Sequence, residues 1–159
     1  MKSFFCIVLL SISFILVAEG FRPLREAKTD VSQILTKLEI EDAIGGPIND
    51  APISTDKSII RYYAVDGTPY LEAMSFAVLD ENAEASFLKQ KNIMRSVHYY
   101  QGELPEFGEK AYWCDNTVTT DIHVIKDSKE LSISVSQSKS GISKLDAAKK
   151  LMKLALSRL

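Results

Sequence analysis

Apolar and polar residues follow one another along this chain in two different periods. Strict alternation and runs of strand-forming residues predict β-strands, whereas apolar positions three or four residues apart predict helices. The strand pattern occurs in five segments: 58–65, 70–79, 110–115, 117–126 and 131–136. The helical pattern occurs in three segments: 36–44, 82–94 and 143–157. The order α-β-β-α-β-β-β-α predicts an α+β domain, with an antiparallel β-sheet flanked by helices that we expect on one face.

The first predicted helix carries signals for both of its ends. Thr36 and Glu39 have the spacing of a capping box, in which each side chain binds the backbone N–H of the other residue. Gly45 and Pro47 predict the stop, because glycine accepts the left-handed C-cap and proline cannot continue a helix. The apolar stripe is expected from Leu38, Ala43 and Ile44, with Ile40 adjoining it.

Turn-forming residues mark several of the remaining boundaries. Asp66-Gly67 predicts a tight hairpin between the first two strands. Residues 48–55 predict a loop. Asp80 or Asn82 is expected to cap the second helix, since short polar side chains accept a hydrogen bond from the first free backbone N–H groups.

The first twenty residues have the organisation of a secretory signal peptide. Lys2 precedes an apolar run from Phe4 to Ala18, and the segment ends at Gly20 with small residues at the cleavage positions. The alternative is an uncleaved anchor, but the run of about 15 residues is shorter than the roughly 20 that a spanning helix needs. We therefore expect cleavage before Phe21 and an exported protein, either periplasmic or secreted.

Length and charge limit what the exported part does. Removing the signal segment leaves 139 residues, which we divide into a flexible leader (21–34) and a single domain (35–159) large enough to bury a core. The formal net charge of −2 argues against nucleic-acid binding, which needs a clear basic excess. Cys6 lies inside the apolar run rather than just after it, so lipid attachment is not expected.

Cys114 is the one cysteine left after the signal segment is removed, which excludes an internal disulfide in the exported part. An odd cysteine in an exported protein indicates either a buried thiol or an intermolecular pair. The neighbouring Tyr112 and Trp113 favour the buried thiol, because free cysteine packs as a small hydrophobe. The prediction is a monomer, or a dimer if Cys114 is exposed.

The most site-like local cluster is His98-Tyr99-Tyr100, after the second helix. Histidine and tyrosine can ligate a metal ion or haem iron, but aromatic residues that close a core beside a loop give the same pattern. Neither histidine of the chain has a second one at ligand spacing. We therefore predict no cofactor and no metal, and name His98, Tyr99, Tyr100 and the nearby Glu106 as weak binding candidates.

Candidates for nucleophilic catalysis are weaker still. His123 lies between Ile122 and Val124, so in a strand it faces away from both and is expected to be solvent-facing or paired across strands. A nucleophile–base pair of Cys114 and His123 would need a cross-strand approach that the sequence does not specify. The serines lack the Gly-x-Ser-x-Gly turn, and we predict that the protein is not an enzyme.

Two further groups of charged residues have simple interpretations. Glu103, Glu106 and Glu109 do not have the spacing of EF-hand calcium ligands. The lysines of the last helix predict a solvated face, which also suits the negative C-terminal end of a helix. Neither group identifies a partner.

Three stretches together form a recognisable pattern: LTKLEI at 35–40 with Gly45-Gly46-Pro47, FGEKAYW at 107–113, and the closing helix with Ala147, Ala148, Leu151 and Leu159. They resemble the small exported bacterial domains of the PsbP-like superfamily, which include many lipoproteins of unknown function. The resemblance implies a helix-flanked antiparallel sheet with a binding or assembly role, generally without catalysis, and no catalytic residues to transfer. Because this chain lacks the lipid-attachment cysteine, a soluble envelope or secreted protein is expected.

The central motif of that pattern has a structural interpretation. Gly108 permits a tight turn, and Ala111 lets a helix approach the sheet closely. Tyr112 and Trp113 are expected to contribute large buried areas.

These observations lead to one main expectation and two alternatives. The main one is a non-catalytic exported binding or accessory protein of the bacterial cell envelope, which uses the exposed sheet face or the loops near Tyr99 and Glu106. Its partner would be an unidentified protein or small molecule. The first alternative is a small-ligand, haem or metal carrier that uses His98, Tyr99 and Tyr100. The second is a small secreted hydrolase that uses Cys114 or His123.

Overall fold

A computed structural model describes residues 30–49, 58–65, 72–79 and 81–159 of the chain. Its strands are β1 (Ile48–Asn49), β2 (Ile59–Ala64), β3 (Glu72–Leu79), β4 (Tyr100–Glu103), β5 (Ala111–Asp115), β6 (Thr120–Lys126) and β7 (Lys129–Val135). Its α-helices are α1 (Lys37–Ile44), α2 (Ala83–Ser96) and α3 (Lys144–Leu156), with 3-10 turns at Val31–Gln33 and Pro105–Phe107. The predicted signal segment, the hairpin at Asp66-Gly67 and the cap at Asp80 lie outside the described residues.

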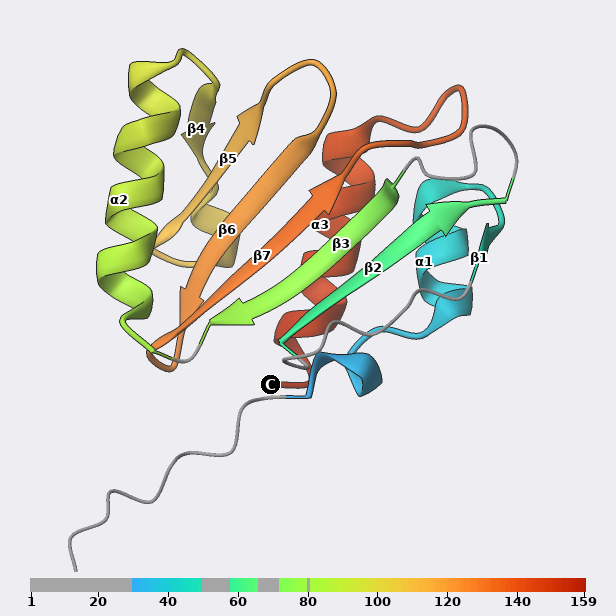
Figure 1. Cartoon of the computed structure of the whole chain (residues 1–159), viewed down its shortest axis with the longest axis horizontal. Coiled ribbons are helices and arrows are strands. Elements are labelled where there is room, and N and C mark those ends of the chain that lie inside the picture. The colour runs from blue at the N-terminus through green and yellow to red at the C-terminus, as the bar shows by residue number, and fades with distance from the viewer. Residues whose placement is uncertain (1–29, 50–57, 66–71, 80) are drawn as a thin grey trace, which may run out of the picture.

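The strands of the described residues form one seven-stranded sheet in the order β1-β2-β3-β7-β6-β5-β4, and neighbouring strands are antiparallel throughout (Figure 1). With the three helices, this arrangement confirms the predicted α+β class. None of the described helices has both the length and the apolar character needed to cross a membrane.

The main core lies between the sheet and helices α1 and α3, which Figure 1 shows behind the sheet. Met74, Phe76 and Val78 of β3 are fully buried on this face, as their alternation predicted. Complete burial of a side chain such as Phe76 contributes about 1.5–3 kcal/mol. The helix α3 contributes five buried residues: Ala147, Ala148, Leu151, Met152 and Ala155.

The opposite face of the sheet is partly covered by α2, which contacts β4, β6 and β7 (Figure 1). Strand β5 explains why a second cover is needed. Ala111 faces the main core, whereas the alternate residues Tyr112 and Cys114 face α2 and pack with Phe87 in a second cluster. The expectation that helices cover one face of the sheet was therefore wrong, because β5 carries apolar residues on both of its faces.

The rest of this second face, over β3 and β7, carries small side chains. Ser75 pairs with Ser134 across the two strands, and Ala77 pairs with Ser132. All four are half-buried. The alternation of serine with apolar residues in β7 is thus confirmed, although α2 shields part of the face that we expected to be wet.

The predicted elements and the observed ones differ mainly where the sequence pattern is short. Strand β1 lies inside the predicted loop at 48–55, and β4 comes before the expected return to strands. Both are short, with two and four residues, and each pairs with a longer neighbour, β2 or β5. The strand expected from Thr117 begins only at Thr120, because Thr117 has a φ of 72° and Val118 is 62% exposed in a turn.

Both predicted signals at the ends of α1 are confirmed. Thr36 and Glu39 form the capping box, and Gly45 adopts the left-handed C-cap with a φ of 78°. The predicted apolar stripe needs one correction, because Leu38 is 77% exposed and Ile40 takes its place in the core. At α2, Asn82 stands at the N-cap position but its side chain caps no backbone N–H, since its own backbone is left-handed.

The domain begins earlier than the predicted boundary at residue 35. Val31 and Ile34, which the predicted leader included, are buried in the main core. Asp30 caps the 3-10 turn by accepting a hydrogen bond from the backbone N–H of Ser32 at 3.0 Å.

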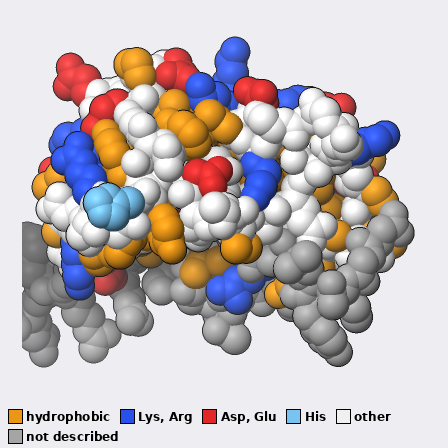
Figure 2. All heavy atoms as spheres, turned by 90° about the horizontal axis from the view of Figure 1, so that it is seen from above, with side chains coloured by type: hydrophobic (Ala, Val, Ile, Leu, Met, Phe, Trp, Pro, Cys, Tyr) orange, Lys and Arg blue, Asp and Glu red, His pale blue; other side chains and the backbone are white. Residues whose placement is uncertain are grey.

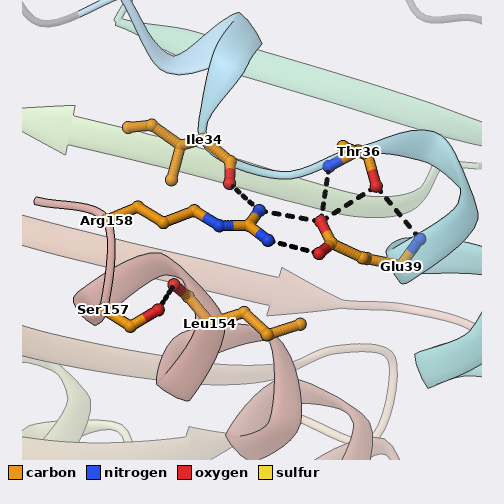
Figure 3. Close-up of polar contacts among 6 residues, drawn as sticks. All are labelled: Ile34, Thr36, Glu39, Leu154, Ser157 and Arg158. Atoms are coloured by element: carbon orange, nitrogen blue, oxygen red, sulfur yellow. Dashed lines mark hydrogen bonds and ion pairs between the residues drawn. The ribbon is translucent and has the colours of Figure 1, made fainter.

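The two ends of the described domain are joined by Arg158, which follows α3 (Figure 3). Its guanidinium donates to the carbonyl of Ile34 at 2.6 Å and to both carboxylate oxygens of Glu39. Glu39 also accepts hydrogen bonds from the backbone N–H and the hydroxyl of Thr36, each at 2.9 Å. One carboxylate therefore caps α1 and holds the end of α3.

Candidate functional site

His98, the centre of the predicted carrier site, ends a helix instead of facing a cavity. It follows α2 with a φ of 62°, and its backbone N–H donates to the carbonyl of Arg95 at 3.2 Å. Its side chain is exposed, as is that of Tyr99. The backbone of Tyr99 continues into the sheet by accepting a hydrogen bond from the N–H of Asp115 at 2.9 Å.

Tyr100 points away from this exposed end and into a cation–aromatic cluster on α2. Its hydroxyl donates to Glu103 Oε1 at 2.6 Å, and the guanidinium of Arg95 lies 4.6 Å from its ring centroid. The structure thus does not bring Tyr100 together with His98 and Tyr99 as a ligand set. Within the described ranges, no group of three His, Cys, Asp or Glu side chains is arranged to hold a metal ion.

The ammonium of Lys91 lies at the centre of the same cluster. Its Nζ is within 5.7–5.9 Å of the ring centroids of Phe87, Tyr100 and Tyr112, and 2.6 Å from Glu103 Oε1. Burial alone would raise the pKa of Glu103, but the hydrogen bonds from Lys91 and Tyr100 hold it below its usual value. These contacts fasten α2 to β4 and β5, so we assign the cluster a structural role.

Glu106, the fourth predicted binding candidate, is engaged in an ion pair with α3. Its Oε1 lies 2.8 Å from Lys149 Nζ, and this hydrogen bond lowers the pKa of Glu106. Lys150 likewise pairs with Asp42 of α1 at 2.6 Å. The prediction of a purely solvated lysine face is therefore corrected: two of these lysines connect α3 to other parts of the domain.

The motif around Gly108 has the structural role that we expected, with one difference. Gly108 has a φ of 112° at the end of the second 3-10 turn, and Ala111 is buried in the main core. Tyr112 is fully buried, whereas Trp113, on the other face of β5, is only half-buried.

A buried polar group lies beneath α2, next to the sites that the sequence suggested. His123 stacks on Tyr112 with ring centroids 4.8 Å apart, and its Nδ1 lies 3.1 Å from Glu130 Oε1. This contact joins His123 of β6 to Glu130 of the neighbouring strand β7. The cross-strand interpretation of His123 is thus confirmed, while its buried partner Glu130 was not anticipated.

Cys114 belongs to the same buried face, as predicted from its neighbours. Burial, with a smaller contribution from Asp121, raises the pKa of its thiol to about 12. Burial also raises the pKa of Tyr112. Since the thiolate is the reactive form of cysteine, Cys114 is not poised to act as a nucleophile.

A hollow of about 390 Å³ opens on the other side of the domain, near the turn that ends α1. We call it the turn pocket. The described residues that line it come from three places: Ile44, Gly45, Gly46 and Pro47 after α1; Ala64 and Ala73 at the ends of β2 and β3; and Gln137, Ser138 and Lys139 after β7. Its volume falls in the range of pockets that hold small molecules.

Small residues explain why this hollow is not filled. Gly45, Gly46, Ala64 and Ala73 carry at most one methyl group each, although they come from three separate segments. The loop after β7 is joined to β3 by backbone hydrogen bonds: the N–H groups of Ser136 and Gln137 donate to the carbonyl of Ala73 at 2.9 and 3.2 Å. Backbone and small side chains therefore form much of the described lining.

The surface at the C-terminal end of α2 carries exposed apolar residues. Val97, Tyr99 and Val118 are exposed there, at the end of α2 and in the turn between β5 and β6. Figure 2, which views the molecule from above, shows hydrophobic side chains interspersed with charged ones on this end. Exposed apolar residues that charges interrupt in this way are ordinary on a protein surface.

Sequence reasoning found Gly45 and Pro47 but missed the pocket that they help to line. The two residues predicted the end of a helix, and residues 137–141 predicted a connecting loop. The sequence does show that Ala64 and Ala73 are small. Their positions beside the pocket, however, depend on how the strands pair in the sheet.

Comparison with known proteins adds no relative: the chain matches no family model, and it has no significant match among curated proteins.

Proposed function

We propose that this protein is an exported, non-catalytic binding or accessory protein of the bacterial cell envelope, and that it holds a small ligand in the turn pocket. The observation that carries the proposal is the hollow itself. About 390 Å³ is open where four glycine and alanine residues of the described lining meet. Export, the envelope location and the PsbP-like relationship stay predictions from the sequence.

A non-catalytic role is supported by the two residues that came closest to catalytic chemistry. Cys114 is buried with a raised pKa, so it holds its proton at neutral pH. The Nδ1 of His123 lies 3.1 Å from Glu130 Oε1 beneath α2, and its ring stacks on Tyr112, so the ring is held between β5 and β7. Each residue therefore has a structural role that accounts for its position.

The experiment is native mass spectrometry of the full chain, expressed with its own N-terminal segment, together with a thermal-shift screen of small molecules. The test variant is Gly46→Leu. Gly46 lines the hollow, and a Cβ there meets no atom within 4 Å, so a leucine adds bulk at the pocket wall without a backbone clash. Ala85→Leu, on the exposed face of α2, adds the same bulk elsewhere.

We expect a bound molecule, or stabilisation by at least one class of compound, in the wild type and in Ala85→Leu. Gly46→Leu should keep the wild-type melting temperature and lose the ligand. Equal binding by Gly46→Leu, or no ligand from either measurement, would refute the proposal. The carrier alternative predicts a metal ion or a haem absorbance band that is lost in His98→Ala.

A further inference from the structure

The lining of the turn pocket has an uneven distribution of charge. The described residues that form its walls are uncharged and mostly aliphatic, with Ile44, Pro47, Ala64 and Ala73 among them. Lys139 is the single charged side chain among those described lining residues. A pocket with apolar walls and one cation favours a ligand that is apolar along its length and negative at one end.

Lys139 is held in a defined position beside the pocket. Its backbone N–H donates to the carbonyl of Ile44 at 2.8 Å. Its stem passes over Gly45 so closely that a Cβ on that glycine would lie 3.0 Å from Lys139 Cβ and 3.6 Å from Cδ. The absence of a side chain at Gly45 thus allows the lysine stem to lie against the turn.

The ammonium of Lys139 differs from those of neighbouring lysines. Lys149 and Lys150 each form an ion pair at 2.8 or 2.6 Å. No carboxylate within the described part of the chain pairs with Lys139, although its side chain is exposed at the pocket. Gln137 adds a second donor group, because its half-buried amide lines the same wall.

We infer that the turn pocket binds an amphipathic carboxylate of medium chain length, with the apolar chain in the hollow and the carboxylate at Lys139 and Gln137. This inference rests on the proposed function and adds the chemical class of the ligand. An ammonium and an amide N–H together satisfy a carboxylate, which accepts several hydrogen bonds. The small-residue walls accept a flexible chain, and the hydroxyl of Ser138, which also lines the pocket, already donates to the carbonyl of Ile142 at 2.7 Å.

Lys139 has a second effect that the experiment must separate from binding. It lies at the C-terminal end of α1, where a positive charge stabilises the helix dipole. Such a structural role changes the melting temperature of the protein but does not distinguish a charged ligand from a neutral one of the same length.

The experiment is displacement of a neutral fluorescent probe, N-phenyl-1-naphthylamine, from the full chain by decanoate and by decanamide. Four proteins are compared: the wild type, Lys139→Gln, Lys139→Arg and Gly46→Leu. An exposed ion pair is worth up to about 1 kcal/mol, so we expect the wild type to bind decanoate about fivefold more tightly than decanamide. That preference should be lost in Lys139→Gln, kept in Lys139→Arg and reduced by added salt.

The outcomes separate this inference from the proposed function. If decanoate and decanamide bind equally well and Gly46→Leu blocks both, the pocket binds ligands and the carboxylate inference is wrong. If neither compound binds while the screen finds another class of ligand, the inference is again wrong and the proposed function stands. An unchanged preference for decanoate in Lys139→Gln would also overturn the inference.

Discussion

Arg158 and Glu39, which lie 119 positions apart in the sequence, form a bidentate ion pair. Glu39 has another use at the same time, because it completes the capping box of α1 with Thr36. The pair therefore couples the start of the first helix to the end of the last one. Local sequence rules predicted the cap, whereas the contact with Arg158 depends on how α1 and α3 pack.

Acid should break this coupling. The hydrogen bond from Arg158, with that from the Thr36 backbone, lowers the pKa of Glu39 from 4.5 to about 2. A pKa that is lower in the folded state stabilises the protein above pH 4.5, and this contribution is lost as the pH falls toward 2. We expect Glu39→Gln to melt a few degrees below the wild type at neutral pH, and the two to converge in acid. Urea unfolding at several pH values measures this, and a constant difference across the range would contradict it.

Gly45 should tolerate substitution poorly, in contrast to its neighbour. A Cβ at Gly45 would lie 2.6 Å from Ile142 Cδ1, and the φ of 78° is strained for any other residue. We expect Gly45→Ala to lower the free energy of unfolding by about 1–3 kcal/mol. Gly46→Ala, where a Cβ meets nothing within 4 Å, should change it by less than about 0.5 kcal/mol. Equal losses in the two variants, measured by chemical denaturation, would show that the turn is not the cause.

The hydroxyl of Tyr112 should contribute little to stability although its ring contributes much. The hydroxyl is buried without a hydrogen-bond partner among the described residues, so its removal deletes an unsatisfied polar group. We expect Tyr112→Phe to be neutral or slightly stabilising. Tyr112→Ala should cost about 3–5 kcal/mol, as for other large aromatic truncations. A clear loss of stability in Tyr112→Phe would reveal a partner for the hydroxyl.

Cys114 should resist modification in the folded protein. Its thiol is buried and its pKa is raised to about 12, so the thiolate is scarce at neutral pH. We expect a thiol reagent to label the denatured chain fully and the native chain only at the rate of unfolding. Rapid stoichiometric labelling of the native protein would instead revive both the covalent dimer and the hydrolase alternative.

Lys91 should matter more than its neighbours on α2. Its charge faces three aromatic rings and Glu103 in a site where the side chain is 15% exposed. Lys91→Met keeps most of the stem but removes the charge, and we expect a loss of about 1–2 kcal/mol. Lys89→Met, on the exposed face of the same helix, is the matched control. Similar unfolding free energies for the two variants would mean that the cluster contributes no net stability.

The sequence predicted the fold best where a local rule determines the structure. The alternation of Met74, Phe76 and Val78 identified their strand, and the capping box located the start of α1. The cover on the second face of the sheet was not predicted. Tyr112 needs this cover because β5 is buried on both faces, and this position in the sheet depends on the tertiary fold. Glu130 was missed for a related reason, since a charged residue at a strand end is buried only when a partner such as His123 is brought to it.

The candidate site was harder to predict than the fold. His98, Tyr99 and Tyr100 are adjacent in sequence, but a left-handed residue after a helix sends their side chains in different directions. The turn pocket combines residues from three segments whose individual patterns are those of a turn, a strand end and a loop. A cavity of this kind forms where glycine and alanine residues from separate segments come together. A single sequence does not show which of these residues are neighbours in the fold.

The sheet order has a consequence for how the chain is made. β3 pairs with β2 on one side and with β7 on the other, and α3 follows β7. During synthesis, β3 therefore leaves the ribosome long before its second partner and its helical cover exist. The described sheet is therefore complete only after β7 has been made, and its main helical cover only after α3. Over that interval the apolar face of β3 is a natural binding site for a chaperone that prevents aggregation.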